Sequence, residues 1–219
     1  MPRPVQRAIL PLMFKPILLA LLLILAPAAH AAPTEEMFAK LKGAAEEAEA
    51  ADVASDIWAT WLESGSPTVD LLMQRAMEAV EFEQYATAHE LLDRVILIKP
   101  DYPEAWHRRA GLFLQEENYP EAFRDLNEAL KLEPRHFGAW LGMGVMLEAL
   151  GGEKQALESY REALAIYPLM PQARAACKHL AGRGRNPPVF PLVFPHHPCG
   201  AGLHAVGGKG HIIGADIVA

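Results

Sequence analysis

Residues 103–134 read PEAWHRRAGLFLQEENYPEAFRDLNEALKLEP, and residues 137–168 read FGAWLGMGVMLEALGGEKQALESYREALAIYP. With Trp106 placed over Trp140, Pro134 falls over Pro168, so both pairs lie 34 positions apart. Residues of the same kind recur at this offset throughout the two segments: Trp106 and Trp140, Ala110 and Gly144, Ala122 and Ala156, Pro134 and Pro168. Self-similarity at a fixed period of this length predicts copies of one supersecondary unit, stacked so that neighbours bury each other.

Each copy contains two stretches with apolar residues at helical spacing, separated by a turn. Asn118 and Pro120 mark the turn and the next helix start in the first copy, and Gly151 with Gly152 marks the turn in the second. Neither helix can bury its apolar stripe alone, and small residues such as Ala110 let paired helices approach closely. The predicted fold class is therefore all-α, an α-solenoid of stacked antiparallel helix hairpins.

The early tryptophan, the small residues in the middle and the closing proline resemble the tetratricopeptide repeat (TPR) family. The resemblance divides this part of the chain into a TPR-like repeat at 69–102 and TPR repeats at 103–136 and 137–170. The first repeat matches less well, because Leu72 replaces the tryptophan and Ala79 replaces an aromatic residue. Residues 171–182 start a further first helix without a partner, which predicts a C-terminal capping helix.

Residues 32–68 form an N-terminal segment that also has helical spacing. Thr34 is predicted to cap its first helix, with Glu35 in the first turn, where the helix dipole favours negative charge. Trp58 and Trp61 lie close together on a second helix and predict a heavily buried face. We interpret the segment as either a degenerate repeat or an N-terminal cap.

Residues 1–31 have the layout of a secretory signal peptide. Three basic residues precede an apolar run at 17–25, and the segment closes on Ala29-His30-Ala31, a small-x-small cleavage pattern. We therefore expect cleavage after Ala31, secretion across the inner membrane to the periplasm, and no stable membrane span in the mature protein. The alternative is an uncleaved N-terminal helix that anchors the protein.

The charge of the chain argues against one class of ligand. Its formal net charge is −7, and removal of the first segment, with three basic and no acidic residues, changes this to −10. An acidic surface repels the phosphate backbone, so nucleic acid is not expected as a partner.

Residue types that perform chemistry are present but are not arranged for catalysis. His107, Arg108 and Arg109 share a predicted helix, yet no nucleophile is placed beside them. We predict no catalytic, cofactor-binding or metal-binding residue and expect that the chain is not an enzyme.

Residues 183–219 form a tail rich in glycine, proline and histidine, and we predict that it is disordered. The tail holds residue types that bind metals, but their spacing fits no recognised zinc pattern. A metal-binding or metal-responsive protein acting through this His- and Cys-containing tail is the alternative function. A disulfide between Cys177 and Cys199 is permitted but not required.

The resemblance to TPR proteins implies that the first helices of the repeats line a concave groove that binds a protein or a peptide. His107 and Gly111 stand where the family's carboxylate clamp would have Lys and Asn, so chaperone C-termini are not expected as ligands. The groove-lining residues implied in this way are Met73, Gln74, Met77, His107, Arg108, Leu114, Leu141 and Val145. The leading hypothesis is a non-catalytic periplasmic scaffold for protein–protein interaction, whose partner the sequence does not identify.

Overall fold

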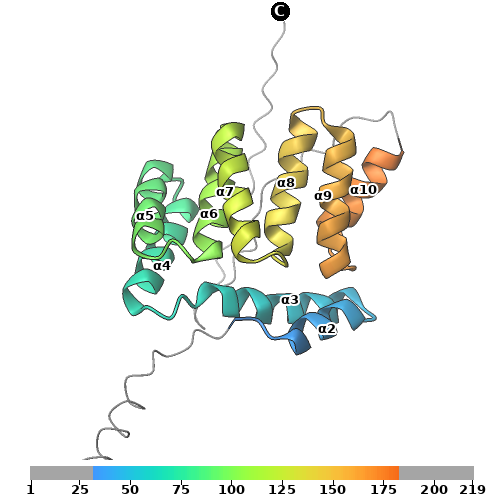
Figure 1. Cartoon of the computed structure of the whole chain (residues 1–219), viewed down its shortest axis with the longest axis horizontal. Helices are drawn as coiled ribbons and strands as arrows, with labels where there is room; N and C mark the ends of the chain where they lie inside the picture. The colour runs from blue at the N-terminus through green and yellow to red at the C-terminus, as the bar shows by residue number, and fades with distance from the viewer. Residues whose placement is uncertain (1–31, 183–219) are drawn as a thin grey trace, which may run out of the picture.

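The structure is a computed structural model that describes residues 32–182, and these residues form nine helices and no strands (Figure 1). Three hairpins, α4–α5, α6–α7 and α8–α9, stand side by side, and α10 packs on α9. The predicted all-α solenoid of stacked hairpins is therefore confirmed for this part of the chain. In chain order the helices are α2 (Glu35–Gly43), α3 (Glu47–Leu62), α4 (Pro67–Glu81), α5 (Tyr85–Ile98), α6 (Pro103–Gln115), α7 (Tyr119–Leu132), α8 (Phe137–Ala149), α9 (Glu153–Ile166) and α10 (Pro171–Ala181).

The turn inside each hairpin has the same backbone conformation in all three repeats. Glu83 and Glu117 both have a φ of 56°, and Gly151, at the third equivalent position, has a φ of 77°. This left-handed region is costly for most residues but not for glycine. The 34-residue period therefore extends to the backbone, although only the third turn uses the residue that adopts it without strain.

Small residues hold the paired helices close together, as the sequence predicts. A Cβ atom added to Gly144 on α8 would lie 2.4 Å from Cε1 of Tyr160 on α9, which is too close for any side chain. Ala110, Ala122 and Ala156 are fully buried at the related positions. Close packing of this kind leaves no room for an additional methyl group unless the hairpin opens.

The two repeat tryptophans, Trp106 and Trp140, are half-buried. The indole N–H of Trp106 donates to the carbonyl of Pro100 at 2.8 Å, and that of Trp140 donates to the carbonyl of Pro134 at 2.9 Å. Each tryptophan keeps a polar edge at the surface because this hydrogen bond satisfies its N–H. Each proline thus follows the end of one helix, and its carbonyl accepts a hydrogen bond from the tryptophan of the next helix.

Arg109 pairs with a buried carboxylate in its own repeat and with an exposed one in the neighbouring repeat. Arg109 on α6 binds both oxygens of Asp125 on α7, with Nε–Oδ2 and Nη2–Oδ1 distances of 2.6 and 2.9 Å. Its Nη1 also donates to Asp93 on α5 at 2.6 Å, and its guanidinium lies 5.1 Å from the ring centre of Trp106. Two-point pairing fixes the orientation of Arg109 on α7 of its own hairpin, and the contact with Asp93 links this hairpin to the first one.

The N-terminal hairpin α2–α3 does not extend the stack. It runs crosswise to the repeat helices, along the side of the stack where α6 and α8 begin (Figure 1). Its α3 packs on α6 and its α2 packs on α9. Thr34 caps α2 as predicted, because its hydroxyl oxygen accepts the N–H of Met37 at 3.3 Å. The choice between a degenerate repeat and an N-terminal cap stays open, and α2–α3 does not stand in line with the three hairpins.

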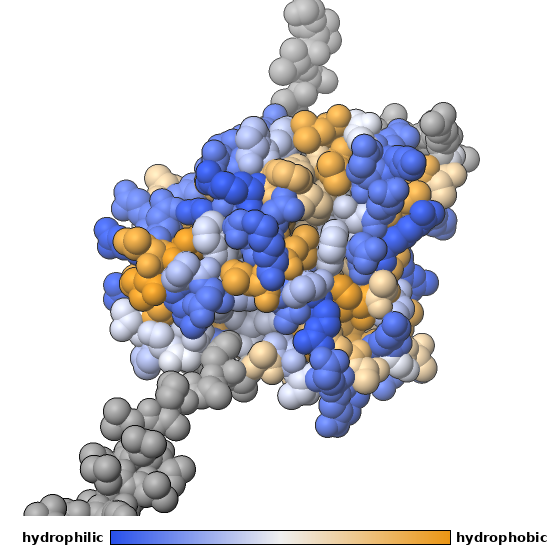
Figure 2. All heavy atoms as spheres, in the orientation of Figure 1, coloured by the Kyte–Doolittle hydropathy of each residue, from blue (hydrophilic) through white to orange (hydrophobic). Residues whose placement is uncertain are grey.

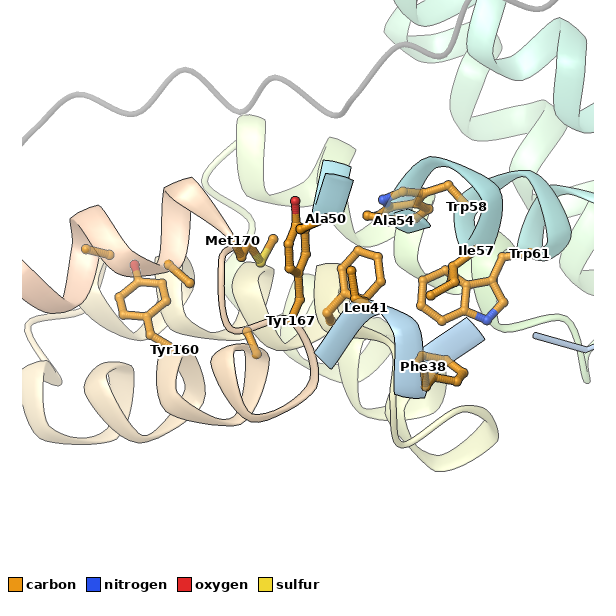
Figure 3. Close-up of a cluster of buried hydrophobic side chains, with 14 of the residues drawn as sticks. Phe38, Leu41, Ala50, Ala54, Ile57, Trp58, Trp61, Tyr160, Tyr167 and Met170 are labelled. Carbon is orange, nitrogen blue, oxygen red and sulfur yellow. The ribbon is translucent and has the colours of Figure 1, made fainter. Parts of the chain in front are cut away.

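A hydrophobic core that contains several aromatic side chains joins this hairpin to the stack (Figure 3). Trp58 and Trp61 from α3 meet Phe137 of α8, with ring centres 5.3 and 5.0 Å apart. Phe137 in turn contacts Tyr167, which follows α9, at 5.5 Å. Burial of several aromatic side chains makes the hairpin an integral part of the fold.

None of the helices in residues 32–182 is long and apolar enough to cross a bilayer. The predicted signal peptide at 1–31 and the predicted tail at 183–219 lie outside the described residues. Cys177 lies on α10 and is half-buried, whereas Cys199 lies outside the described part of the chain, so their pairing stays open.

Candidate functional site

The eight predicted groove residues occupy related positions on α4, α6 and α8. They differ in exposure, and an open groove lined by all eight side chains is not what the structure contains. Their role in binding a partner stays a prediction. Gln74 is exposed; Met77, Leu141 and Val145 are half-buried; Met73, His107, Arg108 and Leu114 are buried.

Trp58 of α3 covers the central positions of the expected groove. Its ring centre lies 5.4 Å from that of His107 and 5.5 Å from the guanidinium carbon of Arg108. On the neighbouring helix, a Cβ at Gly138 would lie 2.6 Å from Cη2 of Trp58. Trp58 therefore fills the space over the beginnings of α6 and α8, and His107 and Arg108 point into the protein.

Met73 and Leu114 are buried for a different reason. Met73 belongs to the core between the first and second hairpins, where Leu92 also lies. Leu114 belongs to the core between the second and third hairpins, together with Leu126. Both side chains lie in the core of the stack, and their part in the predicted groove stays a prediction.

A buried polar cluster lies beneath Trp58 and Trp61. Glu104, in the first turn of α6, is fully buried and accepts from Nε of Arg108 at 2.5 Å through Oε1. Its other oxygen, Oε2, lies 3.0 Å from Nε2 of His136 and 3.6 Å from Nδ1 of His107. A buried carboxylate requires a counter-charge and hydrogen bonds, and these neighbours supply both.

The backbone determines which nitrogen of His136 carries hydrogen. His136 is the residue before α8, and its Nδ1 accepts the N–H of Ala139 at 3.1 Å. The hydrogen of the neutral ring is therefore on Nε2, which donates to Glu104. Trp61 stacks on the same ring, with centres 4.3 Å apart and planes 3° from parallel. His136 thus caps α8, binds α6 and supports α3.

The cluster is electrostatically polarised. Burial raises the pKa of Glu104, but the charge of Arg108 and the hydrogen bonds of His107 and His136 outweigh burial and hold this pKa well below its usual range. Burial, assisted by the nearby His136, lowers the pKa of His107 to about 4. At neutral pH, Glu104 and Arg108 therefore form the ion pair, and His107 contributes as a neutral ring.

Glu104, His107 and His136 are also residue types that bind metals, and their ligand atoms lie within 4.8 Å of one another. Two features favour a hydrogen-bonded cluster instead. A cation at Nε2 of His136 would require the hydrogen on Nδ1, which already accepts from Ala139. Arg108 moreover already neutralises the carboxylate that a cation would need.

Sequence reasoning missed this cluster, although the repeat itself contains a signal. At the 34-residue offset, Glu104 corresponds to Gly138 and Arg108 to Gly142. A charged residue aligned with a glycine shows that the two repeats meet different neighbours at this position. The neighbour is α3, which His107 and Gly138 both contact through Trp58.

Comparison with known families finds repeats in the same region. The family described as tetratricopeptide repeat matches residues 73–129 and 113–171. A TPR repeat-containing protein of Rhizobium etli is 39% identical over 134 residues, which cover 61% of this chain and 66% of that protein. The chain spans no more than 66% of the length of the curated relatives that it matches.

Solved structures give the same architecture. The Arabidopsis OM64 TPR domain aligns with a TM-score of 0.51 and 22% identity over 53% of this chain and 96% of that domain. The TPR2B domain of yeast Sti1, in its complex with pHsp70, aligns with a TM-score of 0.51 and 16% identity over 54% of this chain and all of that one (100%). At these identities the likeness concerns the fold and not the ligand.

Proposed function

We propose that this chain, an all-α solenoid of tetratricopeptide repeats, is a non-catalytic scaffold that binds a protein or peptide on the inner face of its first helices. One observation carries the proposal: α6 and α8 pack directly on each other, so their inner faces form one surface. TPR domains act as scaffolds for protein–protein interaction, and the yeast Sti1 domain is similar to this chain in fold. Stacked repeats offer extended surfaces of this kind for a partner.

The accessible part of this surface favours an apolar ligand. Gln74 and Met77 lie on α4, and Leu141 and Val145 lie on α8, all at least partly open to solvent. Arg108 is engaged with Glu104 beneath Trp58 and adds no positive charge to this surface. A peptide with two or more apolar anchors therefore fits better than an acidic one.

We test this by capture of partners from a cell-envelope fraction with paired variants. Met77→Asp and Val145→Asp place an acid on the proposed surface, and Leu97→Asp places one on α5, where Leu97 is 82% exposed. Loss of one partner with the first two variants but not with Leu97→Asp is the expected result. Gln74→Lys, at an exposed position, provides a further variant that leaves the core intact. Equal capture by all four variants, with unchanged circular dichroism, would contradict binding at this face.

Export to the periplasm is part of the proposal. Its support is the signal-like segment at 1–31, together with the first helix cap, Thr34, which comes three positions after the expected cleavage site. Cell fractionation with N-terminal sequencing tests it, and we expect a periplasmic protein that begins at Ala32. A membrane-bound protein that retains residues 1–31 would favour the anchored alternative, and a cytoplasmic protein would contradict both.

A further inference from the structure

The second repeat shows which side of a first helix meets the preceding hairpin. Ala105 and Leu112 on α6 lie in the core shared with α4 and α5. Arg109 donates to Asp93 of α5, and Glu116, directly after α6, accepts from His89 of α5 at 3.0 Å. The stacking side of α6 therefore consists of four positions: Ala105, Arg109, Leu112 and Glu116.

Within residues 32–182, no hairpin lies beside the same four positions in the first repeat. Subtraction of the 34-residue period gives Leu71, Arg75, Glu78 and Phe82. All four are exposed, and Leu71 and Phe82 expose 48% and 73% of their surface. The reason is the position of α2–α3, which packs on α6 and α9 and leaves this side of α4 open. Figure 2 shows hydrophobic side chains at the surface of this end of the molecule.

We propose that this side of α4, called here the α4 edge (Leu71, Arg75, Glu78 and Phe82), binds a second copy of the chain in a two-fold symmetric dimer. The four positions are symmetric about the midpoint between residues 76 and 77. In an antiparallel pair of α4 helices, Leu71 meets Phe82 of the other copy and Arg75 meets Glu78 of the other copy. Each apolar residue thus faces an apolar one, and each charge faces its opposite.

A second copy fits this edge better than head-to-tail stacking does. The other end of the stack is closed by α10, whose exposed residues include Gln172, Arg174 and Lys178. A head-to-tail contact would place Leu71 and Phe82 against this polar, basic helix, and it would continue into a filament unless its rotation closed a ring. The two-fold arrangement closes on itself and covers both apolar ends of the edge.

The dimer surface adjoins the inner face in the proposed function, because Nε2 of Gln74, a predicted groove residue, donates to Glu78 at 3.0 Å. Arg75 and Glu78 are at the positions that face the neighbouring hairpin in α6, whereas Gln74 and Met77 belong to the predicted groove. Dimerisation and partner capture are measured by different experiments, so either can fail without the other, and a dimer would be a bivalent scaffold. Bivalency raises the apparent affinity for a partner with two binding segments.

Sedimentation equilibrium of the full chain, as it accumulates in cells, tests the proposal over a protein concentration range of about 1–200 µM. Arg75→Glu produces two Glu–Glu contacts in the homodimer, and Glu78→Arg produces two Arg–Arg contacts. Each single variant should raise the dimer Kd by about 10-fold or more, because both symmetric contacts become repulsive. Circular dichroism should stay unchanged, since both side chains are exposed.

A mixture of the two single variants tests the proposed pairing of Arg75 with Glu78 most directly. An Arg75→Glu copy and a Glu78→Arg copy are complementary at both contacts, so the mixture should form a heterodimer. The double variant R75E/E78R should likewise dimerise with itself. A monomeric wild type throughout the concentration range would overturn the proposal. Unaltered dimerisation of both single variants, or a mixture that forms no heterodimer, would also overturn it.

Discussion

The second and third hairpins agree at the positions that stack and differ at the positions that face α3. Ala122 and Ala156 are both fully buried at equivalent places between helices. Beneath the N-terminal hairpin, in contrast, Glu104 of one repeat corresponds to Gly138 of the other. Residues that recur at the 34-residue offset therefore lie at contacts within the stack. Positions where the residue type changes between the repeats lie at the contact with α3, which is outside the repeats.

The two repeats meet α3 by opposite means. A charged and hydrogen-bonded cluster, formed by residues of α6 and by His136 before α8, packs against the rings of Trp58 and Trp61. On α8, the lack of a side chain at Gly138 makes room for Trp58. The polar cluster, called here the platform (Glu104, His107, Arg108 and His136), supports α3, whereas the missing side chain at Gly138 leaves room for it. Substitutions at equivalent positions of the two repeats should therefore change stability by different amounts.

The largest effect is expected when the platform loses its charge. Glu104→Gln keeps the size of the side chain but leaves Arg108 without its counter-charge, and it presents an amide to His136, which already donates. Removal of one partner of a buried ion pair costs about 3–5 kcal/mol of unfolding free energy. Urea unfolding measures this loss. Glu36→Gln is the matched control, because Glu36 is exposed, and a similar change in both variants would contradict the account of the cluster.

The platform should also make stability depend on pH. The pKa of His107 is about 4 in the folded protein, against 6.5 for a histidine that is not buried. Between these values the unfolded chain binds the additional proton, so stability falls as pH falls from 6.5 to 4. The contribution amounts to about 3 kcal/mol over this window. Because the pKa of Glu104 is lowered from its ordinary value of 4.5, this group contributes a further loss of stability as the pH falls below about 4.5.

Unfolding free energies at pH 7.5, 5.5 and 4.5 measure this dependence. A His107→Gln variant serves as the reference, because it lacks the titrating ring while the other histidines and carboxylates remain. We expect the wild type to lose more stability than this variant as the pH is lowered. Equal losses would show that His107 does not titrate as its burial requires.

The repeat stack was predictable from the sequence, because the same residue types recur at one fixed offset. The small residue at Gly144 and the helix that follows Pro168 were expected from that period. The position of α2–α3 was not predictable, because its partners on α6, α8 and α9 lie far away in the sequence. His107 and Arg108 were assigned to an open groove, since nothing local reveals that Trp58 covers them. The difference in residue type between Glu104 and Gly138, which are aligned at the 34-residue offset, was the one sign in the sequence that another segment packs there.

A smaller effect is expected inside a hairpin. Gly144→Ala forces a methyl group against the ring of Tyr160 and should cost about 1–3 kcal/mol of unfolding free energy. Gly43→Ala, on α2, is the matched change, because a Cβ there meets nothing within 4 Å. That substitution should be neutral or stabilise the protein by about 0.5–1 kcal/mol. Thermal unfolding of the two variants measures the contrast, and equal shifts would refute close packing at Gly144.

The smallest effect concerns a contact that both repeats share. Trp106→Phe and Trp140→Phe each remove one indole N–H bond to a proline carbonyl and retain an aromatic ring. Each should lower the unfolding free energy by about 1 kcal/mol, and by similar amounts, because the two bonds are equivalent in the repeat. Chemical denaturation of both variants checks this. A clear inequality would mean that the period does not extend to these bonds.

Hydrogen exchange of the α3 amides tests most directly whether the N-terminal hairpin is part of the fold. If Trp58 and Trp61 are packed on the polar cluster, the amides of residues 51–62 should be protected to a degree similar to those of α6. In Glu104→Gln, the protection of α3 should fall more than that of α9. Exchange of the α3 amides at the rate of an isolated helix in the wild type, with α6 protected, would contradict the account.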